Sequence, residues 1–113
     1  MPKGGFEAMD GKTTIQYLQN YIRAKDHHPE LKKEYMLKLT EEVGELAKAI
    51  RKNQVRAEGA PIKETIDEEL WDVLYYVIAL ANCCGVDLER AIKDKEDINN
   101  RKYNSGMMFE ENR

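Results

Sequence analysis

Two short acidic segments decide the fold that this sequence predicts: EEVGE at positions 41–45 and EELWD at positions 68–72. In each segment, two adjacent acids are followed three residues later by a third. Residues three apart on a helix share a face, so Glu42 lies beside Glu45, and Glu69 lies beside Asp72. If the two helices pack antiparallel, these four carboxylates can converge on one small volume.

Carboxylates gathered in this way repel one another unless a cation of high charge density lies between them. All-oxygen ligands suit Mg²⁺ or Mn²⁺ rather than zinc. Most acidic runs in proteins are only solvated helix faces. Here, however, the pattern occurs twice, and in both segments the acids border the apolar stripe. The sequence therefore predicts a site for Mg²⁺, with Mn²⁺ as an alternative.

Length and composition limit the classes of protein that remain. The 113 residues predict a single domain over 1–113, and 42% of them are hydrophobic while 35% are charged. No apolar run approaches the roughly 20 residues that span a bilayer, and the N-terminus lacks a signal-peptide pattern, so a cytoplasmic location without membrane contact is expected. A net charge of -3 argues against a surface for polymeric nucleic acid. The adjacent Cys83 and Cys84 are expected to stay reduced.

Hydrophobic spacing predicts an all-α fold of four helices, at about positions 13–25, 30–52, 64–84 and 87–103. The expected caps are Thr13, Gly85 and Asp87. The paired histidines at 27 and 28 are expected in a solvated turn, and residues 1–11 and 104–113 are expected to be loosely ordered. The expected apolar stripes are Ile15, Leu18 and Ile22 in the first helix and Met36, Leu39, Val43, Leu46 and Ile50 in the second.

The third helix is apolar on every side from position 73 to 81, where the sequence is VLYYVIALA. A helix of this kind must be enclosed on all sides. Three short helices from the same chain can hardly cover it, so we expect dimerisation to complete the core, giving a homodimer or homotetramer. The aromatic residues Trp71, Tyr75 and Tyr76 are expected in the core or the interface.

The fourth helix has an apolar face, Leu88, Ala91 and Ile92, that turns polar along its length. Lys95, Asn99 and Lys102 continue the same stripe at i, i+4 and i+7. Lysines usually lie at the surface, so a solvated helix end is one interpretation. The other is a row of donors that faces the acidic site and holds phosphate oxygens.

Taken together, these motifs resemble those of the MazG-like nucleotide pyrophosphohydrolases, in the all-α NTP pyrophosphatase superfamily. The resemblance covers residues 13–103 and is carried by three motifs in the family's order. They are EEVGELAKAI at 41–50, ELWDVLYY at 69–76 and the ending Lys95, Asn99, Lys102 and Tyr103. The resemblance implies a four-helix MazG-like bundle that cleaves nucleoside triphosphates between the α and β phosphates with Mg²⁺, giving monophosphate and pyrophosphate.

The resemblance also implies roles for individual residues. The metal ligands of the family match Glu42, Glu45, Glu69 and Asp72. Glu41 matches a position that orients or deprotonates the attacking water. Substrate phosphate or sugar would contact Lys95, Asn99, Lys102 and Tyr103. Lys102 replaces an arginine common in the family and so lacks its bidentate fork.

Two alternatives to this enzyme remain from the sequence. One is a non-catalytic helical dimer that binds nucleotide or a partner protein, because an intact ligand set does not prove turnover. The other is a carboxylate-bridged dimetal redox protein, which is weakened because the chain lacks Glu-x-x-His motifs in facing helices.

Overall fold

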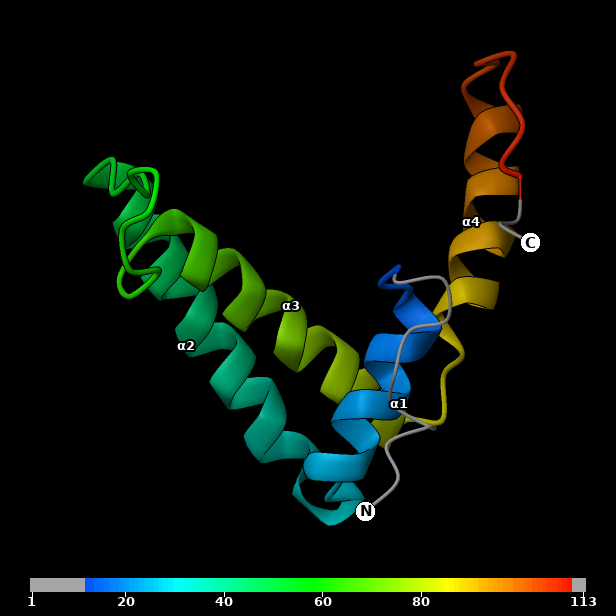
Figure 1. Cartoon of the computed structure of the whole chain (residues 1–113). Coiled ribbons are helices and arrows are strands. Elements are labelled where there is room, and N and C mark those ends of the chain that lie inside the picture. Colours follow the sequence, from blue (N-terminus) through cyan, green and yellow to red (C-terminus); the bar gives the residue numbers. More distant parts are fainter. Residues whose placement is uncertain (1–11, 111–113) are drawn as a thin grey trace.

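The computed structural model describes residues 12–110, and within them the chain is entirely helical apart from turns and connecting segments (Figure 1). The elements are α1 (Ile15–Lys25), the 3₁₀ turn η3 (Pro29–Leu31), α2 (Lys32–Arg51), α3 (Ile66–Cys83) and α4 (Leu88–Lys102). The predicted all-α class with four helices is therefore confirmed. The expectations for residues 1–11 and 111–113 lie outside the described residues.

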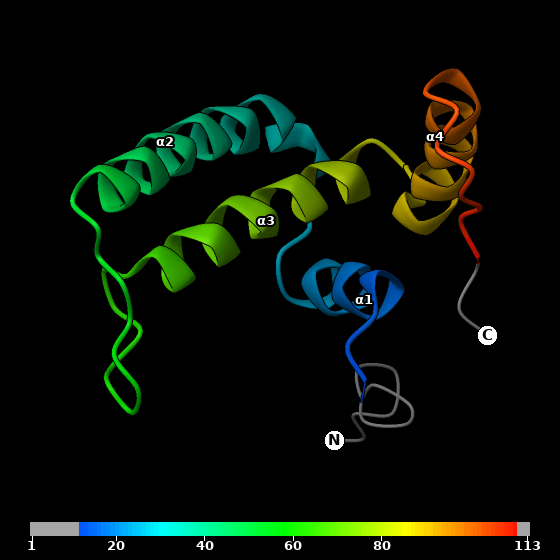
Figure 2. The same cartoon turned by 90° about the horizontal axis from the view of Figure 1, so that it is seen from above.

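Helices α2 and α3 form a long antiparallel pair, and α1 packs against the C-terminal half of α3 (Figures 1 and 2). The buried centre lies where α1 meets α3. There Ile22, Ile78 and Ala79 are almost fully buried, and the partly buried Leu18, Tyr75 and Leu88 pack around them. The core thus sits near one end of the α2–α3 pair and leaves the acidic segments outside it.

A tight turn joins α3 to α4 and changes the chain direction. Gly85 has a φ of 69°, and its N–H donates to Asn82 O at 3.2 Å, while Val86 N–H donates to Ala81 O at 2.9 Å. This pair of bonds is a Schellman motif, in which glycine avoids the strain of the left-handed conformation, so the predicted cap is confirmed. The two helices are bent by 101° at this break. As a result, α4 stands apart from α2 (Figure 1).

A buried amide pair holds α1, α3 and the start of α4 together. Gln19 is 1% exposed, and its Nε2 donates to Asn82 Oδ1 at 3.0 Å and to Val86 O at 2.9 Å. In return, Asn82 Nδ2 donates to Gln19 O, and Leu88 N–H donates to Gln19 Oε1. Buried polar groups are stable only when paired in this way. The sequence analysis missed this pair because a polar residue one position from the apolar stripe resembles a surface residue.

Side chains cap the N-termini of α1, α3 and α4, but the cap of α1 is one residue later than predicted. Thr14, not Thr13, accepts a hydrogen bond from Tyr17 N–H at 3.0 Å. Asp87 caps α4 as predicted by accepting from Arg90 N–H at 3.2 Å. Two adjacent threonines leave the register of the cap open in the sequence, and only the position of the first helical turn decides between them.

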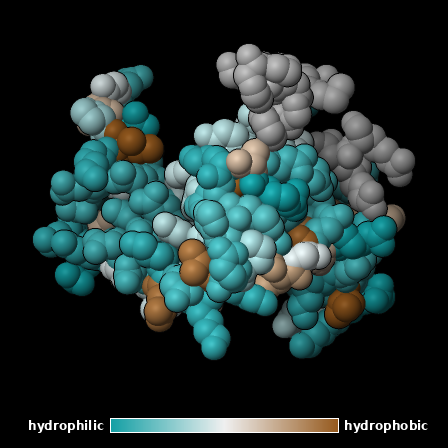
Figure 3. Space-filling view, turned by 90° about the horizontal axis from the view of Figure 1, so that it is seen from below, coloured by the Kyte–Doolittle hydropathy of each residue, from teal (hydrophilic) through white to brown (hydrophobic). Residues whose placement is uncertain are grey.

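The prediction that Met36, Val43 and Ile50 lie in a buried face is wrong for the single chain, where their exposed fractions are 51%, 49% and 57%. Helix α3 covers only one side of α2, so Leu39 and Leu46 are half-buried while the other three remain outside. Hydrophobic side chains likewise reach a largely hydrophilic surface in Figure 3. The outer face of α3 is also uncovered, with Leu70, Leu74 and Val77 exposed.

None of the helices within residues 12–110 is, by itself, long and apolar enough to cross a bilayer. Helices α3 and α4 together meet the length and composition of such a span, but only as a sharply bent pair.

Candidate functional site

The structure brings together three of the four predicted carboxylate ligands. Glu42 comes from α2, and Glu69 and Asp72 come from adjacent turns of α3, with one oxygen of each within 4.8 Å of the others. Oxygens around a single Mg²⁺ lie about 3 Å apart when adjacent and about 4 Å apart when opposite. The three carboxylates therefore need only small side-chain rotations to coordinate one cation.

The electrostatics of this cluster also favour a cation. The pKa of Glu42 is raised by burial and then by the charge of Asp72, and the pKa of Glu69 is raised by burial and then by Asp72 and Glu42. Burial, followed by the charge of Glu68, raises the pKa of Asp72. Each raised pKa means that the folded chain disfavours the ionised carboxylate. A hard divalent ion would reverse this preference, so the donor set fits such an ion.

The two remaining acids of the first segment lie at the edge of the cluster. Glu45 is exposed and lies outside the group of three, yet its charge adds to the raised pKa values of Glu42 and Glu69. Glu41 is also exposed, and its Oε1 lies 3.7 Å from Lys38 Nζ. The roles predicted for these two residues, ligand and water-orienting group, remain predictions.

A pocket of about 170 Å³ opens directly beside the cluster. The segment that joins α2 to α3 forms part of its wall, and its lining includes charges of both signs. The lining residues are Glu45, Lys48, Lys52, Gln54, Glu64 and Glu69. Glu69 thus belongs both to the cluster of three carboxylates and to the wall of this pocket.

The α3 end of the site is fixed by a reciprocal pair of caps. Thr65 Oγ1 accepts from Glu68 N–H at 3.3 Å, and Glu68 Oε1 accepts from Glu64 N–H at 2.7 Å. This arrangement orients the first turn of α3, which carries Glu69. The signal was present in the sequence as a threonine followed three residues later by glutamate.

The four residues predicted to contact substrate lie on α4 or at its end, and one chain does not bring them to the carboxylates. Lys95 is exposed, and Asn99 Nδ2 donates to Glu96 Oε2 at 3.1 Å. Lys102 Nζ lies 5.3 Å from the ring centroid of Tyr103, which is 70% exposed. Helix α4 is attached to α1 through Gln16 N–H and Glu89 Oε2, away from the middle of α2 (Figure 1).

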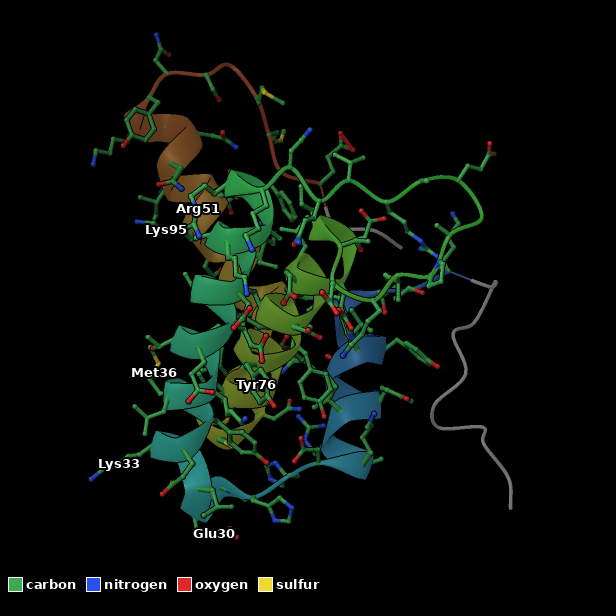
Figure 4. The ribbon with its side chains drawn as sticks, turned by 90° about the vertical axis from the view of Figure 1, so that its left-hand side faces the viewer. Glu30, Lys33, Met36, Arg51, Tyr76 and Lys95 are labelled. Carbon is green, nitrogen blue, oxygen red and sulfur yellow. The ribbon has the colours of Figure 1, made fainter. Side chains whose placement is uncertain are left out.

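On the side toward α1, the site borders aromatic side chains that the sequence analysis assigned to the core or interface. Tyr76 lies among the side chains between α2 and α3 (Figure 4), with its ring 6.3 Å from that of Tyr35 and 5.2 Å from that of Tyr75. The pKa of Tyr76 is raised overall, first by burial. The charge of Lys38 opposes this shift and the charge of Glu42 adds to it. Tyr76 therefore lies near enough to Glu42 for the charge of that carboxylate to raise the pKa of its hydroxyl.

Beyond these rings, Asp26 joins three elements and was missed by the sequence analysis. Its Oδ1 accepts from Tyr35 Oη at 2.6 Å and its Oδ2 from Tyr75 Oη at 2.7 Å. Burial alone would raise the pKa of Asp26, but these two bonds together with the charges of His28 and Lys25 outweigh it, and the net shift is downward. The sequence around Asp26 indicates only a turn that ends a helix. It gives no signal of these contacts, because the two tyrosines lie 9 and 49 residues further along the chain. In the same turn His28 is exposed as expected, whereas His27 is half-buried.

Comparison with known proteins gives a family match over most of this region. The family described as "MazG nucleotide pyrophosphohydrolase domain" matches residues 30–105. The dCTP pyrophosphatase 1 of Homo sapiens is 42% identical over 76 residues, and that of Mus musculus is 42% identical over 73 residues. Each of these alignments covers 60% of this chain and 43% of the relative, so the chain spans less than half the length of these relatives.

The solved structures of iMazG from Vibrio DAT 722 have the same fold. A form with a C-terminal tag has a TM-score of 0.70 and 45% identity, covering 77% of this chain and 98% of that one. The form with an N-terminal tag has a TM-score of 0.72 and 46% identity, covering 81% and 99%.

Proposed function

Since this chain belongs to the family of MazG nucleotide pyrophosphohydrolase domains, we propose that it hydrolyses nucleoside triphosphates between the α and β phosphates. The products would be a nucleoside monophosphate and pyrophosphate. The observation that carries the proposal is the convergence of Glu42, Glu69 and Asp72 from two helices. The negative charge of this cluster repels an anionic substrate, so a cation is needed between them.

The cation is proposed to be Mg²⁺, with Mn²⁺ as an alternative, held by the three clustered carboxylates and by Glu45 after a rotation of its exposed side chain. When bound, such an ion supplies charge neutralisation of phosphate oxygens and activation of a water. Glu41, exposed beside Glu42, is proposed to orient or deprotonate that water. Its ion pair with Lys38 is solvent-exposed and therefore weak enough to open.

The substrate row Lys95, Asn99, Lys102 and Tyr103 is proposed to act from a second copy of the chain. One chain holds α4 away from the carboxylates, and it leaves apolar side chains of α2 and α3 exposed. Covering these apolar faces with another protomer would bury them and could bring a partner's α4 to the site. The assembly would be a homodimer or homotetramer. A cytoplasmic location remains a prediction.

The test is a product analysis with dCTP as the first substrate, since the relatives named above are dCTP pyrophosphatases. Ion-exchange chromatography should show dCMP and pyrophosphate forming with Mg²⁺ and not with EDTA. Glu69→Gln should abolish the reaction, whereas Lys33→Ala, at an exposed site, should not. Release of dCDP and orthophosphate would place the cleaved bond elsewhere. Binding without turnover of dCTP and the other nucleoside triphosphates would favour the non-catalytic nucleotide-binding dimer.

A further inference from the structure

The pocket beside the carboxylate cluster contains two lysines to which the proposed reaction assigns no role. Lys48 in α2 and Lys52, the residue that caps the end of α2, follow Glu45 at i+3 and i+7, so they continue the face that carries the acids. Both line the pocket together with Glu45 and Glu69. Any group held by the cluster and extending along α2 toward its C-terminus would therefore meet these two ammonium groups.

Neither ammonium group forms an ion pair in the described part of the chain. Lys38 pairs with Glu41, and Lys93 pairs with Asp97, but no ion pair among residues 12–110 includes Lys48 or Lys52. Glu45, Glu64 and Glu69 share the pocket with them, and Glu69 also belongs to the cluster that we propose to hold the cation. A polyanion that bridges the metal and the lysines would pair with the cation at one end and with the ammonium groups at the other.

The far wall of the pocket is fixed by the backbone. Gln54 N–H donates to Ala49 O at 2.9 Å, and Ile66 N–H donates to Gln54 O at 2.9 Å. These two bonds tie the segment after α2 to the start of α3, and Gln54, which makes both, lines the pocket.

The opposite end of the carboxylate cluster has a different chemistry. There the rings of Tyr35, Tyr75 and Tyr76 lie within 6.3 Å of a neighbouring ring. A triphosphate centred on the cluster has one wholly anionic end, the β and γ phosphates, and one end that carries the aromatic base. The charged end matches the lysine pocket and not the aromatic wall.

We infer that Lys48 and Lys52 bind the pyrophosphate part of the substrate and hold the pyrophosphate product before it leaves. The inference rests on the proposed function for the position of the scissile bond. It names a contact that lies within one chain, in contrast to the row on α4.

The experiment measures binding of inorganic pyrophosphate in the presence of Mg²⁺ by calorimetry, for the wild type and for Lys48→Ala, Lys52→Ala and the double variant. Lys33→Ala is the matched control, since Lys33 is an exposed lysine near the other end of the same helix (Figure 4). Each pocket variant should raise the pyrophosphate Kd by about tenfold, which corresponds to about 1.4 kcal/mol. Lys33→Ala should leave the Kd unchanged. Binding of dCMP should be equal in all variants.

Wild-type pyrophosphate affinity in the double variant would overturn the inference, and so would an equal loss in Lys33→Ala, which would indicate only general charge attraction. The proposed function is tested separately by the dCTP product analysis. A chain that binds pyrophosphate through the lysines but never hydrolyses a triphosphate would sink the function and keep the subsite. If the wild type hydrolyses dCTP but the lysine variants bind pyrophosphate normally, the proposed function stands and the lysine subsite is wrong.

Discussion

At the scale of single residues, Asp26 makes one of the most concentrated sets of polar contacts in the structure. Two tyrosine hydroxyls, from α2 and α3, donate to its two oxygens at 2.6 and 2.7 Å. Hydrogen bonds to a charged group contribute about 1.5–3 kcal/mol each. This carboxylate therefore ties the turn after α1 to both helices of the long pair.

We expect Tyr35→Phe to lower the free energy of unfolding by about 1.5–3 kcal/mol, because it removes one bond to a charged acceptor. Because the pKa of Asp26 is lowered from 3.8, its contribution to stability is present above that value and is lost as the pH falls through the folded pKa. Urea unfolding at neutral and acid pH measures both effects. Tyr17→Phe is the control, since no hydrogen bond to the Tyr17 hydroxyl occurs within residues 12–110. Equal stability of the two variants would contradict the role of Asp26.

In the carboxylate cluster the pKa shifts are upward, so their effect on the pH dependence of stability is opposite to that of Asp26. The pKa of Glu69 is raised in the folded chain. Without metal, its contribution to stability is therefore fully present below the ordinary value of 4.5 and is lost as the pH rises through the folded pKa. Glu69→Gln removes one repelling charge, so it should melt higher than the wild type in EDTA at neutral pH. It should also reduce the decline of stability above pH 4.5.

Mg²⁺ should change the two proteins differently. At ten times its dissociation constant, an ion that binds only the folded state adds about 1.4 kcal/mol, or on the order of 5–10 °C in Tm for a domain of this size. The wild type should show this gain and Glu69→Gln should not. Thermal melts with Na⁺ at matched ionic strength provide the control. An equal shift of the wild type by Mg²⁺ and by Na⁺ would mean that the acids are ordinary surface charge.

At the scale of helices, side-chain caps fix where α1, α3 and α4 begin and hence which face each presents. Thr14 caps α1, and this places Ile22 and Gln19 toward α3. Thr65 and Glu68 fix the start of α3 and so the direction of Glu69. The elements that carry the site are thus positioned by side chains that have no part in its chemistry.

We predict that Thr14→Ala destabilises the protein by about 1 kcal/mol, the usual contribution of an N-cap, while Thr13→Ala has almost no effect. The adjacent threonine makes a close control, because both substitutions remove the same atoms from neighbouring exposed sites. Chemical unfolding of the three proteins measures the difference. A larger loss in Thr13→Ala would show that the helix begins one residue earlier.

At the scale of the whole molecule, the chain leaves apolar side chains exposed on both helices of the long pair. Val43 is 49% exposed on α2 and Leu74 is 39% exposed on α3. The buried core, in contrast, is a small cluster near α1. A chain of this size with such a core gains stability by association.

We expect the wild type to be a dimer or tetramer in sedimentation experiments and Val43→Glu to be a monomer, since a charge in an apolar interface is costly. Val55→Glu should keep the wild-type assembly, because Val55 is 67% exposed in the segment after α2. A wild type that sediments as a monomer would remove the proposed assembly.

A complementation experiment tests whether two chains share one site. In a mixed dimer of Glu69→Gln and Lys95→Ala, one site combines intact carboxylates from one protomer with an intact Lys95 from the other. Co-expressed and purified through two different tags, the mixed assembly should regain activity that neither variant has alone. No recovery would mean that each chain uses its own α4.

Local sequence patterns predicted the helical class, the approximate helix bounds and the three clustered acids, although Glu45, predicted with them, lies outside the cluster. These follow from spacing along the chain. Hydrophobic residues recur every three or four residues, and acids at i and i+3 share a helix face whatever lies opposite. Gly85 and Asp87 are likewise local signals, because the left-handed turn and the N-cap depend on the residues beside them.

Which chain segments meet depends on the packing of the helices and could not be predicted from local patterns. The pairing of Gln19 with Asn82, the two tyrosines on Asp26 and the lysine pocket beside Glu69 join residues from different helices. Spacing within one helix carries no information about the angle at which another helix crosses it. For the same reason the sequence predicted one buried stripe on α2, whereas α3 covers only half of it and leaves Val43 exposed.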